Sequence, residues 1–301
     1  MQSKSIKKII TFLAVTLALS SIFYYLILTG GSLDTAGGLY VLGLMWAPGL
    51  AGIITQLVFE RSLRGMGWKL GKFKYLAAAF LLPLAYCLVV YGITWATGLS
   101  GFPEPALMPL IRERWGGLTA SPALQILLTM ALTVIFGLIP GLISSLGEEI
   151  GWRGLFVPEL AKVTGFGRVA LISGGVWAAW HMPLLLFSDY NLPGAPVWYA
   201  ALMFTVLVIG ISYAFAWLRL KSGSLWTAVL LHTMHNIFVQ GVFTPFTERN
   251  ELTPYIIDEF GIGLALAGLV VAFYYWRKRK ALPQEQEKEA EGLLARAMGQ
   301  I

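Results

Sequence analysis

The segment LQILLTMALTVIFGLIPGLISSL, residues 124–146, decides the fold class of this chain. It contains no Asp, Glu, Lys or Arg, and about 20 mostly apolar residues are enough for a helix to cross the hydrocarbon core of a bilayer. Working outward from it, seven further stretches are long and apolar enough to do the same. The eight predicted spans are Ile9–Leu28, Leu39–Phe59, Tyr75–Thr97, Leu124–Leu146, Val169–Phe187, Val197–Leu218, Ser224–Phe243 and Phe260–Trp276.

The composition of the whole chain agrees with a membrane assignment. Of its 301 residues, 57% are hydrophobic and 13% are charged, whereas a soluble domain carries about 25% charged residues. Backbone polar groups in lipid must be satisfied internally, and these runs lack the alternating pattern of barrel strands. We therefore predict an all-α, polytopic membrane bundle of about eight transmembrane helices, and we exclude a soluble globular protein.

Basic residues are distributed unequally between the two sides of the predicted bundle. If the N-terminus is cytoplasmic, 19 of the 22 Lys and Arg residues fall in cytoplasmic segments, and the other three are Arg112, Arg114 and Arg249. Because cytoplasmic loops are enriched in Lys and Arg, both termini are predicted to face the cytoplasm. The alternative for the N-terminus is a cleavable signal peptide that ends near Ser20, but the apolar run continues past that point to Leu28.

The net charge of +6 does not indicate nucleic-acid binding. The basic residues lie in short loops between apolar blocks rather than in one solvated patch. The predicted partners are therefore the lipid bilayer and a membrane-associated substrate, with no nucleic acid.

Ionisable side chains inside membrane spans are costly, and each one suggests a function. They are few here, and they include all three histidines of the chain. With a rise of about 1.5 Å per residue, they fall at similar depths, so we expect an active site that opens toward the cytoplasmic half of the membrane. The candidate residues are Glu148, Glu149, Arg153, His181, His232 and His235, with the amide of Asn236 beside them.

The spacing predicts different roles for the two carboxylates. Glu149 and Arg153 are four residues apart on a helix, where they can form an ion pair that secures the turn after the fourth span. His235 is interpreted as a packing or hydrogen-bonding neighbour on a different helix face from His232. This leaves Glu148 to meet the other two histidines.

Such a set of side chains predicts hydrolysis, with a peptide bond as the target. Glu148 can deprotonate a water molecule, while N–H donors of histidine or of Asn236 stabilise the oxyanion that forms. Glu148, His181 and His232 would also make a two-histidine, one-carboxylate Zn²⁺ site with an open position for water. The residues alone leave both mechanisms open.

Three motifs resemble those of the CPBP family, which includes CAAX prenyl proteases and bacteriocin-processing enzymes and is also called the ABI family. They are Glu148-Glu149-Ile-Gly-Trp-Arg153, Trp177-Ala-Ala-Trp-His181 and His232-Thr-Met-His-Asn236, which are similar to EExxxR, FxxxH and HxxxN. One departure is Trp177, where the family often has Phe.

The resemblance implies an intramembrane endopeptidase of the type II CAAX prenyl endopeptidase kind. Glu148 would be the water-activating base assisted by His181, and His232 with Asn236 would form the oxyanion hole. Glu149 and Arg153 would support the site.

The predicted spans and the position of the motifs together divide the chain, and the resemblance implies what it cleaves. Residues 124–243 would be the CPBP-like catalytic core with helices four to seven, preceded by 1–123 with the first three transmembrane helices. Residues 244–280 would hold the last transmembrane helix and 281–301 a charged cytoplasmic tail. The substrate would be a prenylated CAAX protein or another membrane-associated peptide, such as a bacteriocin or signal peptide.

Two other functional classes remain as alternatives. A non-catalytic scaffold or immunity protein would leave the costly buried groups unexplained. A proton-coupled transporter would more often show repeated halves, and the sequence has no visible repeat.

Overall fold

The computed structural model describes residues 2–116 and 121–283, and within these ranges all regular structure is helical. Six helices are long and apolar enough to cross a membrane, which confirms the predicted all-α membrane bundle. They are α1 (Gln2–Gly30), α2 (Leu39–Glu60), α3 (Phe73–Ala96), α5 (Pro122–Glu149), α7 (Phe166–Phe187) and α8 (Val197–Ser222). After α5, the helical segment continues through the π-helix η2 (Ile150–Phe156) into α6 (Val157–Ala161).

Two further segments pass along the bundle but are shorter. One consists of α9 (Trp226–Asn236), the π-helix η3 (Ile237–Phe243) and the one-turn α10 (Thr244–Phe246), and the other is α12 (Ile262–Arg277). Because neither is a single helix of spanning length, the predicted number of eight spans is not confirmed. The remaining short helices are η1 (Thr35–Gly38), α4 (Leu107–Trp115), α11 (Thr253–Ile256) and η4 (Lys278–Ala281).

Helix α5 carries the first motif and is fixed at both ends. Ser121 caps its start, because its hydroxyl accepts a hydrogen bond from the Leu124 amide at 3.4 Å, and Pro122 suits the first turn. Toward its other end, α5 packs closely against α2 at glycine positions. A Cβ added at Gly49 would stand 2.2 Å from the Gly147 carbonyl oxygen, and one at Gly151 would stand 2.3 Å from that of Pro48. These small residues let the backbones approach closely beside the Glu148-Glu149 pair.

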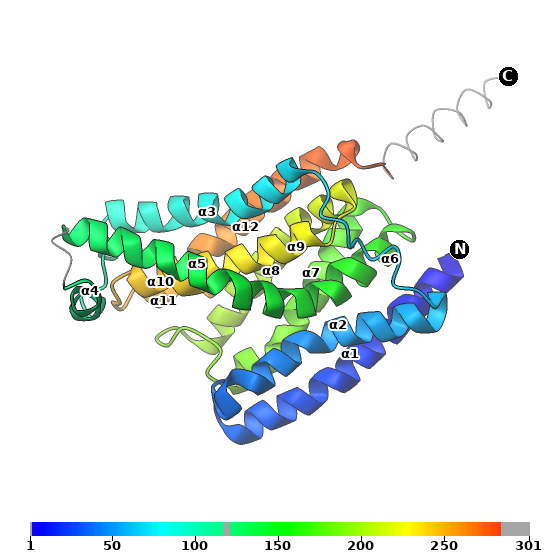
Figure 1. The fold of residues 1–301 in the computed structure, drawn as a ribbon, viewed down its shortest axis with the longest axis horizontal. Coiled ribbons are helices and arrows are strands. Elements are labelled where there is room, and N and C mark those ends of the chain that lie inside the picture. The colour runs from blue at the N-terminus through cyan, green and yellow to red at the C-terminus, as the bar shows by residue number, and fades with distance from the viewer. Residues whose placement is uncertain (1, 117–120, 284–301) are drawn as a thin grey trace.

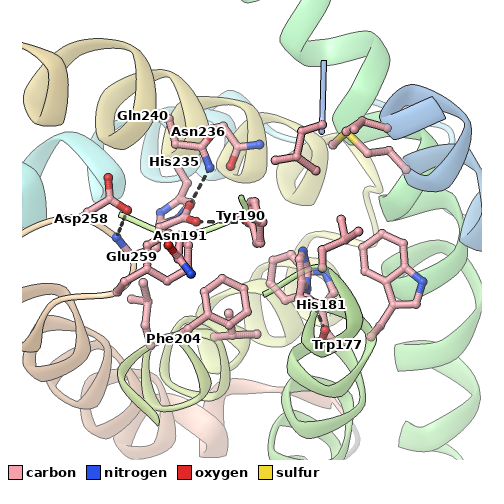
Figure 2. A pocket seen from close by; sticks show the side chains of 18 of the residues that line it. Trp177, His181, Tyr190, Asn191, Phe204, His235, Asn236, Gln240, Asp258 and Glu259 are labelled. Atoms are coloured by element: carbon pink, nitrogen blue, oxygen red, sulfur yellow. Dashed lines mark hydrogen bonds and ion pairs between the residues drawn. The ribbon is translucent and has the colours of Figure 1, made fainter. Parts of the chain in front are cut away.

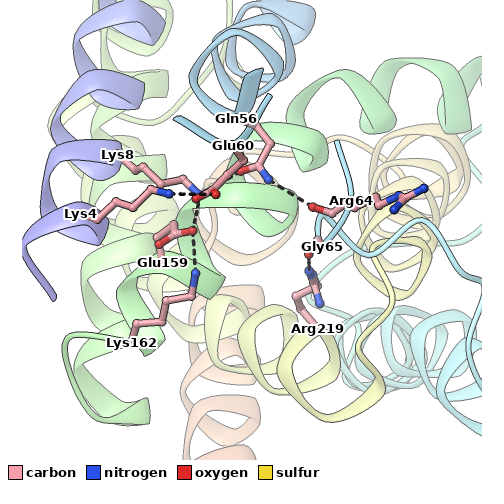
Figure 3. Close-up of polar contacts among 9 residues, drawn as sticks. All are labelled: Lys4, Lys8, Gln56, Glu60, Arg64, Gly65, Glu159, Lys162 and Arg219. Atoms are coloured by element: carbon pink, nitrogen blue, oxygen red, sulfur yellow. Dashed lines mark hydrogen bonds and ion pairs between the residues drawn. The ribbon is translucent and has the colours of Figure 1, made fainter. Parts of the chain in front are cut away.

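The helices alternate in direction, so their connections gather at two ends of the bundle (Figure 1). We call one the terminal end, since it holds the N-terminus, the loop 61–72, the turns 162–165 and 223–225, and the segment that follows α12. Its parts are tied together: Lys8 donates to Gln56 at 2.9 Å and binds Glu159 (Figure 3), and the Trp226 indole donates to the Trp68 carbonyl at 2.8 Å.

The opposite, distal end holds the loops 31–38, 97–116, 188–196 and 247–261. These loops also contact one another. The Leu33 amide donates to Asp189 at 3.2 Å, the Tyr199 hydroxyl donates to the Tyr255 carbonyl at 2.7 Å, and the Glu248 amide donates to the Gly101 carbonyl at 3.0 Å. The two ends therefore give fixed reference points for the location of any site.

Candidate active site

The helices that carry the first and third motifs both change to π-helix at the motif, within the first motif and directly after the third. Helix α5 ends at Glu149 and η2 begins at Ile150, while α9 ends at Asn236 and η3 begins at Ile237. A π-helical turn holds an extra residue and re-aims the side chains around it, and such turns are frequent at functional sites. In this chain, Asn236 lies directly before η3, Glu148 is separated from η2 only by Glu149, and both line the same cavity.

Glu149 is fully buried, and its carboxylate contacts the side chains of Arg153 and His232. One of its carboxylate oxygens accepts from Arg153 Nη1 at 2.8 Å and lies 3.0 Å from His232 Nδ1. Arg153, also fully buried, lies between two aromatic rings, with its guanidinium carbon 4.2 Å from the Trp177 ring centre and 4.1 Å from that of Phe215. The i,i+4 ion pair predicted from the spacing is present, and it has the additional task of orienting His232.

Glu148 has a different environment from its neighbour. Its carboxylate accepts one hydrogen bond at 2.8 Å, from the Trp177 indole, and it lines the cavity although the residue is only 2% exposed. The indole nitrogen can only donate, so this bond fixes the carboxylate without neutralising it. The aromatic residue of the second motif thus positions Glu148, a role that phenylalanine cannot perform.

His181 stands one helical turn after Trp177. Its Nδ1 lies 2.9 Å from the Trp177 carbonyl oxygen, which can only accept, so Nδ1 carries the proton and Nε2 is left with a lone pair in the neutral ring. The ring also packs against Trp180 and Phe204, with ring centres 4.8 and 5.0 Å away. His181 is therefore held rigidly with an acceptor nitrogen available.

A cavity of about 420 Å³ brings the predicted site residues together. Glu148, His181, His232 and Asn236 all line it, and Figure 2 shows His181 with Trp177 on one side and Asn236 with His235 on the other. Its remaining wall is mainly apolar, with residues from α2, α7 and α8. Arg153 and Glu149 are not among the residues that line it, which agrees with a supporting role.

A second polar cluster borders the cavity, and the sequence analysis missed most of it. His235 Nε2 lies 2.9 Å from Glu259, its Nδ1 hydrogen-bonds the Tyr86 hydroxyl, and Gln240 donates to the same Glu259 oxygen at 3.0 Å. His235 was expected to be a packing or hydrogen-bonding neighbour, and it does make hydrogen bonds. Glu259 lies outside the predicted spans, so only its position directly before the last apolar stretch gave a signal.

The two adjacent carboxyl groups of this cluster differ in acidity. Burial and the neighbouring Glu259 carboxylate raise the pKa of Asp258 to about 7. Burial opposes ionisation of Glu259 as well, but hydrogen bonds from His235 and Gln240 outweigh it and lower the pKa of Glu259. The cavity therefore keeps a charged carboxylate beside a carboxyl group that titrates near neutral pH.

The predicted Zn²⁺ ligands Glu148, His181 and His232 line the same cavity, but they are not arranged as a metal site. Within the described ranges, no three His, Cys, Asp or Glu side chains are arranged so that they could hold a metal ion. The described residues thus give no support to a metalloprotease.

Loops of the distal end also contribute to the cavity. It is lined by Leu33, Asp189, Asn191 and Asp258, all from loops at the end of the bundle opposite the termini. That both termini face the cytoplasm and that the active site opens toward the cytoplasmic half of the membrane stay predictions.

The fold and the membrane-spanning helices define an integral membrane protein with a cavity to which all three motifs contribute residues. Residues 129–238 match the model of the family described as type II CAAX prenyl endopeptidase, Rce1-like. This range includes all three motifs, so the chain carries an Rce1-like domain and the predicted resemblance is confirmed. The family supports an intramembrane protease at the level of class.

One curated protein is similar over part of this domain. It is "CAAX prenyl protease 2" from Methanococcus maripaludis, which is 26% identical over 100 residues. The matched region covers 32% of this chain and 36% of the relative, so the chain spans about a third of the curated relative that it matches.

Proposed function

We propose that this protein is an intramembrane endopeptidase in which Glu148 activates water for attack on a peptide bond. The observation that carries the proposal is that the two adjacent glutamates have different contacts. Glu149 is bound by Arg153 and His232, whereas Glu148 lines the cavity and accepts a hydrogen bond from the Trp177 indole. A buried carboxylate with free acceptor capacity beside a cavity is suited to act as a general base.

The reaction would use the two sides of the cavity in turn. Glu148 accepts a proton from water, with His181 Nε2 available as a second acceptor that orients the same water. The water oxygen then bonds to the carbonyl carbon. The C–N bond breaks, and the proton held by Glu148 passes to the leaving amine, so the products are a carboxylic acid and an amine.

Charge develops on the carbonyl oxygen during the attack, and two donors are available for it. Asn236 lines the cavity and carries an amide N–H₂ group. His232 has its Nδ1 directed at Glu149, so its Nε2 can donate when the ring is protonated, and the buried carboxylate compensates that charge. Each oxyanion donor of this kind typically contributes about 10²–10³ in rate.

The substrate class follows from the setting of the cavity and from the family. A largely apolar cavity within a membrane bundle suits a peptide attached to the bilayer, either prenylated at a CAAX sequence or held by an apolar segment of its own. A scaffold or transporter role would leave the arrangement of Glu148, His181 and Asn236 without a purpose.

Cleavage profiling tests this proposal. The protein purified in detergent is incubated with a library of lipidated and unlipidated peptides, and products are identified by mass spectrometry, with metal content measured on the same sample. We expect internal cleavage by the wild type, the same cleavage by Glu113→Gln on exposed α4, and none by Glu148→Ala. Equal cleavage by Glu148→Ala would refute the role of this residue.

A further inference from the structure

A second cavity, of about 580 Å³, lies at the terminal end, and none of the described residues lines both it and the candidate active site. Its walls come from α1, α2, the loop 61–72, η2 and α6. The apolar stretches of the first two helices end beside it, since Lys8 directly precedes Ile9–Leu28 and Glu60 directly follows Leu39–Phe59. The second cavity therefore lies at the depth of the lipid headgroups rather than in the hydrocarbon core.

Side chains of both charges converge on the second cavity from three helical segments (Figure 3). Lys8 is 2% exposed, donates to Gln56 at 2.9 Å and to Glu60 at 3.3 Å, and binds Glu159, which uses its three N–H donors. Lys162 donates to the same Glu159 oxygen at 2.8 Å, but its side chain is 55% exposed. This bond uses only one of the three N–H donors of Lys162, so the lysine can bind a ligand as well.

Glu159 is the residue that indicates a ligand. Its Oε1 accepts from Lys8 and Lys162, whereas its Oε2 is buried and has no hydrogen-bond partner within the described ranges. Leaving a buried acceptor without a donor is costly, and native structures rarely do so. A ligand of the second cavity should therefore bring an N–H or O–H donor to Glu159.

Donors for the opposite kind of group also line the second cavity. Besides Lys162, the Ser62 hydroxyl is available, because it accepts from the Arg64 amide at 3.2 Å and keeps its own proton to donate. A phosphate ester that carries a primary ammonium group matches both halves of this lining. A quaternary ammonium group has no N–H donor for Glu159, and a purely anionic headgroup would leave Glu159 without a partner.

We propose that the second cavity binds the headgroup of a phospholipid with a primary amine, of the phosphatidylethanolamine type. The ammonium group donates to Glu159, and the phosphate accepts from Lys162 and Ser62. Pockets between membrane helices at this depth are suited to recognise headgroups, which favours a lipid over a soluble phosphate ester as the source. The inference does not depend on the proposed peptidase activity.

The second cavity is also connected to the first motif. Gly154 and Leu155, which line it, belong to η2 and directly follow Arg153. A bound headgroup therefore contacts the same π-helical turn that holds Arg153 against Glu149.

Native mass spectrometry of the delipidated full chain in detergent tests the proposal. The probes are phosphatidylethanolamine, phosphatidylcholine and phosphatidylglycerol with identical acyl chains, and soluble phosphoethanolamine is the competitor. We expect one phosphatidylethanolamine to bind about tenfold or more tightly than either other lipid, since each of these lacks the hydrogen bond to a charged group. Equal binding of phosphatidylcholine, or tighter binding of phosphatidylglycerol, would overturn the proposal. Phosphoethanolamine that competes at the same concentration as the lipid would overturn a lipid as the source.

Two variants locate the bound lipid. Ser62→Trp fills the second cavity without removing any ion pair, and Lys162→Met removes a phosphate donor; each should weaken phosphatidylethanolamine binding by about tenfold or more. Lys69→Met removes an exposed basic side chain of the loop 61–72 that does not line the second cavity, and it should bind like the wild type. Undiminished binding by the first two variants, or an equal loss in Lys69→Met, would contradict this site. The Tm of each variant verifies folding, and the exposed position of Lys162 keeps the test decisive if Ser62→Trp does not fold.

Discussion

Removing the charge of Arg153 should destabilise the protein much more than removing an exposed basic residue. Arg153 and Glu149 are a fully buried ion pair at 2.8 Å, and the guanidinium is also stacked between Trp177 and Phe215. Breaking a buried pair by removing one partner costs about 3–5 kcal/mol. For Arg153→Met, this corresponds to a loss of about 6–20 °C in Tm, taking about 2–4 °C per kcal/mol.

Thermal unfolding in detergent measures this loss, and two further variants isolate its cause. In Glu149→Gln/Arg153→Met, no unpaired charge is left, so the double variant should recover part of the loss. Lys162→Met removes a basic side chain that is 55% exposed and paired with Glu159, and it should cost less than about 1 kcal/mol. The reasoning fails if Arg153→Met is as stable as Lys162→Met, or if the double variant is no more stable than the single one.

Three other predictions address the chemistry and the titration of the cavity. Asn236→Ala should lower kcat by about 10²–10³ yet leave measurable cleavage, because one oxyanion donor remains; loss as complete as that of Glu148→Ala would argue against a donor role. Active protein should keep its activity in a strong chelator, since within the described ranges no three His, Cys, Asp or Glu side chains are arranged to hold a metal ion; stoichiometric zinc that is lost together with activity in His232→Ala would reverse this view. Asp258→Asn should raise Tm at pH 8 more than at pH 5, because a carboxyl group whose pKa rises from 3.8 to about 7 on folding destabilises the folded state as pH increases through that interval; an equal change at both pH values would refute the raised pKa.

The long apolar helices could be predicted from the sequence because the bilayer imposes a length and a polarity on them. The start of α1, in contrast, could not be predicted from the sequence. The apolar run begins at Ile9, but the helix begins at Gln2, since Lys8 is buried against Gln56 and Glu159 beyond the apolar stretch. Hydropathy detects the part of a helix that meets lipid, whereas a polar extension is stabilised by partners far away in the chain.

The candidate site residues could be predicted because buried ionisable groups are rare in membrane spans. The spacing also predicted the Glu149–Arg153 pair, but not that Glu149 would hold His232 as well, since that contact joins helices 83 positions apart in the chain. Glu259 was missed for a related reason. It lies in a loop in the sequence, and only the fold turns this loop inward to His235.

The central claim is that Glu148 is the base that activates water, and Glu148→Gln tests it most directly. The substitution keeps the size of the side chain and an acceptor for the Trp177 indole, but an amide cannot take a proton from water. With folding verified by an unchanged Tm and with Glu113→Gln as the matched control, turnover of the best peptide substrate should fall to the uncatalysed background. Turnover by Glu148→Gln within tenfold of the wild type would contradict the account.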